Sequence, residues 1–248
     1  MDTAALQKNS RRSFAMLDCI SVANMRDSDA YTIAHLVPSL ELMHRAAMGV
    51  YGAGSWQGRT AIVTGSGNNG GDGYALACIL ADAGFDCEIF SVSDRLSHDS
   101  AHYAALARAA GVPVTPFAPD CLKGFDTVVD CLLGTGFQGP VRENYRAAIE
   151  AINESAAFVI SVDINSGMNG DTGEGSIVVR SDLTVTIGYV KRGLVTEAAG
   201  RHIHRLICAP IGIELVRKEE QLCKPNEYTG QPGTIPAPKW LDMSYHNR

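Results

Sequence analysis

Short apolar segments that run into glycine recur along this chain, and they restrict the fold more than any other feature. Thr60–Thr64, Phe125–Leu133 and Phe158–Ile164 are largely apolar, without the alternation of a half-buried strand. Strands of this kind are buried on both faces, as in parallel sheets covered by helices. Four more strands are expected at Cys87–Val92, Val112–Phe117, Leu183–Ile187 and Leu206–Ile211.

Segments with helical spacing of apolar residues lie between these strands. We expect helices at Ser39–Tyr51, Tyr74–Ala83, His98–Ala110 and Asn144–Ile152, the second and third of which are followed by glycine. The repeated order of strand and helix predicts an α/β protein. Its Rossmann-like, mainly parallel sheet would carry helices on both faces in three layers, α/β/α.

The length of 248 residues fits one large α/β domain with a full core. We expect a variable N-terminal segment at residues 1–17, a Rossmann-type domain at 18–223 and an extended C-terminal tail at 224–248. The tail holds four of the ten prolines.

Composition excludes several classes of partner. The net charge is −6 and no stripe of Lys or Arg appears, which argues against nucleic acid. No apolar run approaches the ~20 residues that span a bilayer, and the N-terminus lacks a secretory signal, so we expect a cytoplasmic protein that does not contact membranes. The seven cysteines are scattered without a CxxC pair, which favours buried free thiols over disulfides or a zinc site.

The segment Gly65–Gly73 (GSGNNGGDG) is the first of three glycine-rich segments that follow a strand. We interpret it as a solvent-facing loop whose backbone approaches phosphate oxygens, assisted by the N-terminus of the next helix. A plain turn between strand and helix is the alternative, but it leaves Asn68, Asn69 and Asp72 unexplained. An acidic residue here would cap the helix, bind a cation or face a sugar.

The second segment, Asp130–Pro140, contains Gly134-Thr135-Gly136 and could hold the other end of a dinucleotide. Asp130 lies within an apolar strand and would be costly to bury without a partner. Either backbone amides of a neighbouring loop or a bound cation could provide that partner.

The third segment begins at Asp163 and continues into Asn165-Ser166-Gly167. Ligands of doubly wound sheets bind beyond the carboxyl ends of strands, and Asp163 lies at such an end. A helix cap is the alternative role for Asp163. Three segments of this kind together favour a ligand site more than any one of them alone.

These segments resemble those of the YjeF N-terminal domain family, which contains NAD(P)H-hydrate epimerases. The resemblance rests on NNGGDG at residues 68–73, on Asp130 with Gly134–Gly136, and on Asp163 with Ser166-Gly167. It extends from about Ile20 to Ile213 and includes Met25-Arg26-Asp27 with Asp29, and Lys191 with Gly193. The family usually has proline where this chain has Asn165, which leaves the loop shape after Asp163 open.

The resemblance implies interconversion of the R and S hydrates of NADH and NADPH, a repair of damaged nicotinamide cofactor. Two alternatives stay open: a non-catalytic dinucleotide- or protein-binding module of the same fold, and a Rossmann-type oxidoreductase. The oxidoreductase is disfavoured because no acidic residue follows the second strand cleanly, although Asp94 comes close. Retention of Asp163 and of all three segments favours the epimerase.

The resemblance also assigns roles to residues. Asp163 would be the catalytic base that stabilises a cationic intermediate, while Lys191 would position the substrate or pair with a phosphate. One potassium ion per subunit would be bound by Asn69, Asp130 and Ser166. The expected partners are the hydrated dinucleotide and a second copy of the chain in a homodimer, with dehydratase activity on a separate chain. The substrate-binding residues would be Asn68, Asn69, Gly70, Gly71, Asp72, Gly134, Thr135, Gly136, Phe137, Gln138, Gly139, Pro140 and Asp163.

Overall fold

A computed structural model describes residues 19–217 of the chain. The predicted segments 1–17 and 224–248 lie outside the described residues. No helix among residues 19–217 is long and apolar enough to cross a membrane.

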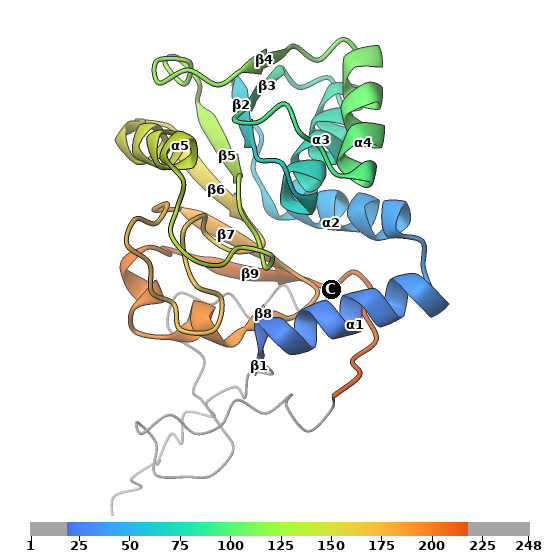
Figure 1. Cartoon of the computed structure of the whole chain (residues 1–248). Coiled ribbons are helices and arrows are strands. Elements are labelled where there is room, and N and C mark those ends of the chain that lie inside the picture. Colours follow the sequence, from blue (N-terminus) through green and yellow to red (C-terminus); the bar gives the residue numbers. More distant parts are fainter. Residues whose placement is uncertain (1–18, 218–248) are drawn as a thin grey trace, which may run out of the picture.

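A seven-stranded, fully parallel sheet forms the centre of the molecule (Figure 1). Its spatial order is β4-β3-β2-β5-β6-β7-β9, so the strand order reverses between β2 and β5. A separate two-stranded parallel sheet pairs β1 with β8. The strands are β1 (Cys19–Ile20), β2 (Thr60–Thr64), β3 (Cys87–Ser91), β4 (Val114–Pro116), β5 (Thr127–Cys131), β6 (Phe158–Val162), β7 (Leu183–Ile187), β8 (Val190–Lys191) and β9 (Leu206–Ala209).

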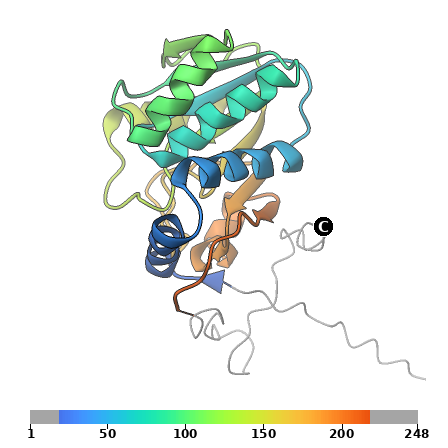
Figure 2. The same ribbon diagram turned by 90° about the vertical axis from the view of Figure 1, so that its right-hand side faces the viewer.

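Helices cover both faces of the large sheet, which confirms the predicted three-layer α/β/α architecture. Helices α2, α3 and α4 lie side by side over one face (Figure 2), and α5 packs on the other. The helices are α1 (Val22–His35), α2 (Ser39–Ala53), α3 (Asn68–Asp82), α4 (His98–Ala109) and α5 (Glu143–Glu154), with 3₁₀ turns η1 (Arg192–Val195) and η2 (Ala199–Arg201).

The continuously apolar strands are buried on both faces, as their sequences predict. In β5, Val129 belongs to the core beneath α2–α4, while the adjacent Val128 belongs to the core beneath α5. Successive side chains of a strand point to opposite faces, so each face requires its own apolar residue. Burial of β5 is complete, since all five residues are buried.

The glycine-rich segment after β2 differs from the prediction, because α3 begins at Asn68 and includes the whole NNGGDG sequence. These glycines serve close packing. A Cβ at Gly71 would lie 2.5 Å from the Met43 Cε atom, and one at Gly70 would lie 2.3 Å from the Gly65 carbonyl oxygen. Gly71 is therefore buried in a helix–helix contact, and the expected solvent-facing turn at this position is wrong.

Helix α1 was not predicted, since three of its four buried residues are polar. Asn24, Ser28 and Thr32 are fully buried at helical spacing, and they bond to the chain segment 214–217. Ser21 caps the first turn by accepting a hydrogen bond from the Asn24 amide. Polar residues at helical spacing give no hydrophobic pattern, so the usual signal of an amphipathic helix is absent.

The expectation of free thiols holds for five of the cysteines and fails for Cys19. Cys19 is disulfide-bonded. The free cysteines of the described part are Cys78, Cys87, Cys121, Cys131 and Cys208. Burial raises the pKa of the Cys87 and Cys208 thiols to about 11, so both stay protonated and unreactive at neutral pH.

Candidate active site

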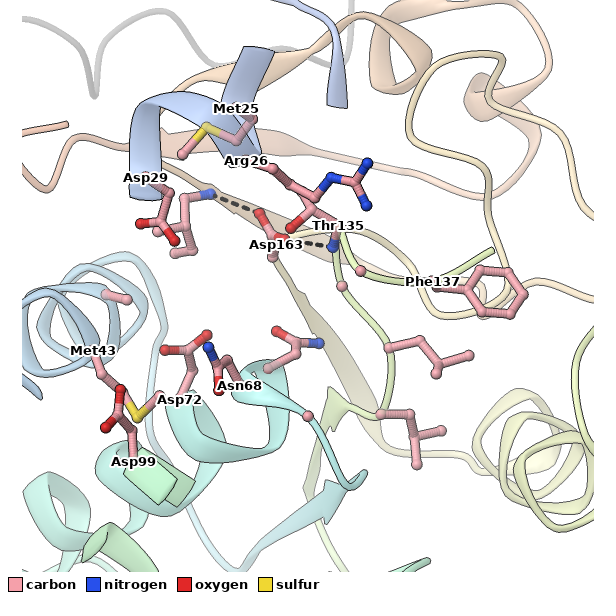
Figure 3. A pocket seen from close by; sticks show the side chains of 18 of the residues that line it. Met25, Arg26, Asp29, Met43, Asn68, Asp72, Asp99, Thr135, Phe137 and Asp163 are labelled. Atoms are coloured by element: carbon pink, nitrogen blue, oxygen red, sulfur yellow. Dashed lines mark hydrogen bonds between the residues drawn. The ribbon is translucent and has the colours of Figure 1, made fainter. Parts of the chain in front are cut away.

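A cavity of about 640 Å³ opens at the carboxyl ends of the strands, at the point where the strand order reverses. Residues that follow β2 and residues that follow β5 line it from two sides, and α1 and α2 contribute further walls. Ligands of doubly wound sheets bind at such a reversal, because the diverging connections leave a crevice between them. The three segments predicted to form a ligand site therefore converge here (Figure 3).

A buried ion pair lies at the end of β6. The Lys191 ammonium is fully buried and donates a hydrogen bond of 2.5 Å to Asp163 Oδ1, with others to Thr186 Oγ1 and the Ile187 carbonyl. An ammonium has three donors, and all three of these partners belong to the protein. Lys191 is therefore buried, and its donors are all used within the protein. It holds the carboxylate in place and has no donor left for a phosphate.

Asp163 has an uncommon backbone conformation, with a φ of 69°. It is the one non-glycine residue with positive φ among residues 19–217. Conformations of this kind cost of the order of 1–3 kcal/mol and persist where surrounding contacts fix them. Here the Asp163 amide donates to the Val185 carbonyl, and the Thr135 amide donates to Asp163 Oδ2 at 3.2 Å. The carboxylate is thus fixed at the cavity wall, where its side chain is 12% exposed, and it caps no helix.

Asp130 is fully buried, and hydrogen bonds from the neighbouring loop satisfy it. Ser166 donates to it twice, from Oγ to Oδ1 at 2.6 Å and from its amide to Oδ2 at 2.9 Å. The Ser161 hydroxyl and the Leu132 amide complete the set. Burial raises the pKa of Asp130, although these hydrogen bonds oppose the shift. Of the two partners considered for Asp130, the structure provides the loop donors.

Asn69 is the contrasting case, because its side chain is buried without a partner. Both Oδ1 and Nδ2 lack a hydrogen bond to any described residue. The side chain lies beside Gly134, where an added Cβ would come within 3.2 Å of the Asn69 Cβ and 3.0 Å of Asp163 Oδ2. An unpaired buried amide is costly, and native sites commonly reserve such a group for a ligand or ion.

Three further carboxyl groups line the cavity: Asp29 from α1, Asp72 from α3 and Asp99 from α4 (Figure 3). Burial raises the pKa of Asp29 and Asp72, and the negative charge of Asp163 raises both pKa values further, while Lys191 opposes the effect. The shift is larger at Asp72, whose pKa the charge of Asp29 also raises. The cavity thus combines the ion-paired Asp163 with two carboxyl groups, Asp29 and Asp72, whose pKa values are raised.

Two arginines reach the cavity, and the sequence did not single them out. Arg26 and Arg142 line it with exposed side chains, and neither forms an ion pair with a described residue. Tyr145 also lines it, and its hydroxyl accepts a hydrogen bond from the Ser66 amide. Arg26 and Asp29 occurred in the sequence resemblance without a role, because only the position of α1 brings them to the site.

Most residues predicted to bind the substrate line this cavity. Gly70, Gly71 and Gly139 do not line it, nor do Asp130 and Ser166, which lie beneath it. Asn165, the departure from the family, is buried and bonds to the Val179 carbonyl, Ser181 and Thr184. The predicted residues at the cavity are Asn68, Asn69, Asp72, Gly134, Thr135, Gly136, Phe137, Gln138, Pro140, Asp163 and Lys191.

The model of one protein family, YjeF-related protein N-terminus, matches residues 39–193. The chain belongs to this family. The matched range contains α3, the segment after β5, Asp163 and Lys191. These parts line the cavity where it adjoins the large sheet.

Curated relatives and one solved structure are consistent with this membership. The chain is 37% identical over 201 residues to NAD(P)H-hydrate epimerase of Limosilactobacillus fermentum, a match that covers 77% of this chain and 95% of that protein. It is 37% identical to the bifunctional NAD(P)H-hydrate repair enzyme Nnr of Archaeoglobus fulgidus, covering 69% of this chain but 36% of that one. The crystal structure of yeast ynu0 (YNL200c) shares the fold, with a TM-score of 0.67, 20% identity and coverage of 88% of this chain and 100% of that one.

Proposed function

We propose that this chain is an NAD(P)H-hydrate epimerase, which interconverts the R and S hydrates of NADH and NADPH. The observation that carries the proposal is the Asp163–Lys191 pair, fixed at the wall of a cavity at the strand-order reversal. Relatives named as epimerases match across most of this chain. Site chemistry and family membership therefore favour the same reaction.

The cavity contains suitable groups for the two ends of a dinucleotide. The amides of Gly134 and Gly136 and the N-terminus of α3 would approach the phosphates, since these N–H groups form no hydrogen bond within residues 19–217. Arg26 and Arg142 are the cations free to pair with a phosphate, because the Lys191 donors are all used within the protein.

The reaction itself requires charge stabilisation and proton transfer. Loss of the C6 hydroxyl as water leaves an iminium cation in the ring, and water returning from the other face inverts the carbon. The Asp163 carboxylate would stabilise the cation and accept a proton from the incoming water. Lys191 holds the Asp163 carboxylate in one orientation through a direct hydrogen bond, so it acts as a positioning residue.

A potassium ion is part of this proposal, and the structure bears on which residues would hold it. Asn69 fits best, because its buried amide oxygen has no other partner. Asp130 and Ser166 bond to each other, so they would join the ion only by giving up part of that network. When bound, the ion would supply positive charge beside the dinucleotide site and a partner for Asn69.

Three further expectations stay predictions. They are the homodimer, the cytoplasmic location and the placement of the dehydratase activity on a separate chain. The bifunctional relatives match this chain over about a third of their length, so the activity of the whole of those proteins does not transfer to it.

The test is direct measurement of inversion at C6. Pure R-hydrate of NADH is incubated with the protein, and the R and S forms are separated by chromatography over time. We expect the mixture to equilibrate faster than the spontaneous reaction, with NADPH hydrate as a second substrate. Equilibration at the spontaneous rate, together with thermal stabilisation by NADH or NADPH, would identify the chain as a non-catalytic binding module.

A further inference from the structure

We propose that Asp29 of α1 is a second catalytic carboxyl group of the site, the one that protonates the departing C6 hydroxyl. This inference rests on the proposed function. It adds to Asp163 a proton donor on a different element, in a part of the chain that precedes the matched family range.

The position of Asp29 brings it to the cavity together with Asp163. Asp29 lies on the face of α1 that lines the cavity, as do Met25, Arg26, Ala30 and Ile33. Asp163 reaches the same cavity from the end of β6 (Figure 3). The two carboxyls therefore reach the same cavity from different elements, and inversion needs two such groups: one for the departing oxygen and one for the entering oxygen.

The two carboxyls also differ in their bonding. Asp163 forms an ion pair with Lys191 and accepts from the Thr135 amide. The Asp29 side chain has neither a hydrogen bond nor an ion pair to any residue between 19 and 217, although it is half-buried. A half-buried carboxyl that accepts no hydrogen bond is stabilised in its neutral form, which is the form that can donate a proton.

The surrounding charges favour the same assignment. Burial is the largest cause of the raised pKa of Asp29, followed by the charge of Asp163, while Lys191 opposes both. Asp72 faces it from α3 and has a pKa raised further still, so it adds little negative charge when protonated. Arg26, on the same helix, is exposed to solvent. The environment thus raises the pKa of Asp29, whereas Asp163 is held in an ion pair with Lys191.

The proton balance of one turnover follows from these states. Asp29 transfers its proton to the hydroxyl oxygen while the C6–O bond breaks, and water departs. A second water attacks C6 from the Asp163 side and gives its proton to that carboxylate. The enzyme then holds the proton on Asp163, which is the state required for the reverse inversion. Exchange with solvent after product release returns the proton to Asp29.

The test compares Asp29→Asn with Asp27→Asn in the full chain. Asp27 lies on the same helix but is exposed and ion-paired with Arg217, so it serves as the matched control. We expect Asp29→Asn to lower kcat by roughly 10²-fold with little change in KM, which is the usual size of a lost proton donor. Asp27→Asn should stay within about twofold of wild type, and both variants should melt within about 2 °C of wild type.

The pH profile separates a proton donor from a structural residue. Wild-type kcat/KM should fall as pH rises through the raised pKa of Asp29, because the donor is then ionised. The remaining activity of Asp29→Asn should lack this fall, and Asp29→Glu should restore part of kcat together with the fall. Unchanged kcat in Asp29→Asn, or a loss confined to KM, would overturn the inference. An inactive wild-type protein would instead refute the proposed function.

Discussion

Replacing Lys191 by methionine tests whether the buried ion pair is a structural requirement as well as part of the site. Methionine preserves the volume of the lysine stem, so the change removes the charge without leaving a large cavity. Removal of one partner from a buried pair typically costs about 3–5 kcal/mol, because the other charge is left uncompensated. Asp163 keeps its bond from the Thr135 amide and a small exposure to the cavity, which places the expected loss near the lower end, about 3 kcal/mol.

Equilibrium unfolding in urea measures this loss, and calorimetry should show a Tm lower by about 6–12 °C for a chain of this size. Arg192→Met is the matched control, since Arg192 is the next residue and forms an exposed ion pair with Asp171. We expect its effect to stay within about 0.5 kcal/mol. In the double variant Asp163→Asn with Lys191→Met, part of the stability should return. Equal losses in Lys191→Met and Arg192→Met would refute the argument from burial.

Three other changes test separate parts of the site. Asp163→Asn should lower epimerisation by about 10²-fold or more while NADH still raises the Tm, and near-normal turnover would remove Asp163 from the mechanism. Gly71→Val should destabilise the fold by about 1–3 kcal/mol in urea unfolding, because the new side chain overlaps Met43; unchanged stability would contradict the packing seen here. Wild-type protein should melt at a higher temperature in potassium chloride than in choline chloride, and Asn69→Ala should abolish the difference; equal melting of the wild type in both salts would count against the ion.

Helix α1 is the element that the sequence alone could not predict. The seven strands of the large sheet and helices α2, α4 and α5 follow from apolar runs and helical periodicity, and the structure confirms them within a few residues. In α1 three of the four buried residues are polar, Asn24, Ser28 and Thr32, and their partners lie more than 180 positions away in sequence. Their burial depends on tertiary hydrogen bonds, which no local pattern reveals.

The candidate site likewise has parts that the sequence predicts and parts that depend on the tertiary fold. The three segments that follow strands could be assigned to one site, because each follows an apolar strand and the carboxyl ends of parallel strands meet at one edge of the sheet. The role of Lys191 could not be deduced, since β8 belongs to a separate small sheet whose pairing with β1 depends on the tertiary fold. The packing of Gly71 was also missed, because a helix start and a loop can share one glycine-rich sequence.

The hydrogen bonds beneath α1 give this helix a single rotational setting. An apolar seam tolerates small slides and rotations, whereas directional bonds from Asn24, Ser28 and Thr32 to residues 214–217 hold in one register only. A turn of the helix by one residue, about 100°, would carry Asp29 out of the cavity. Residues 214–217, at the C-terminal end of the described chain, thus fix the orientation of Asp29 near its N-terminal end. Substitutions at 214–217 would therefore alter the site by rotating α1 about its axis, without replacing any residue that lines the cavity.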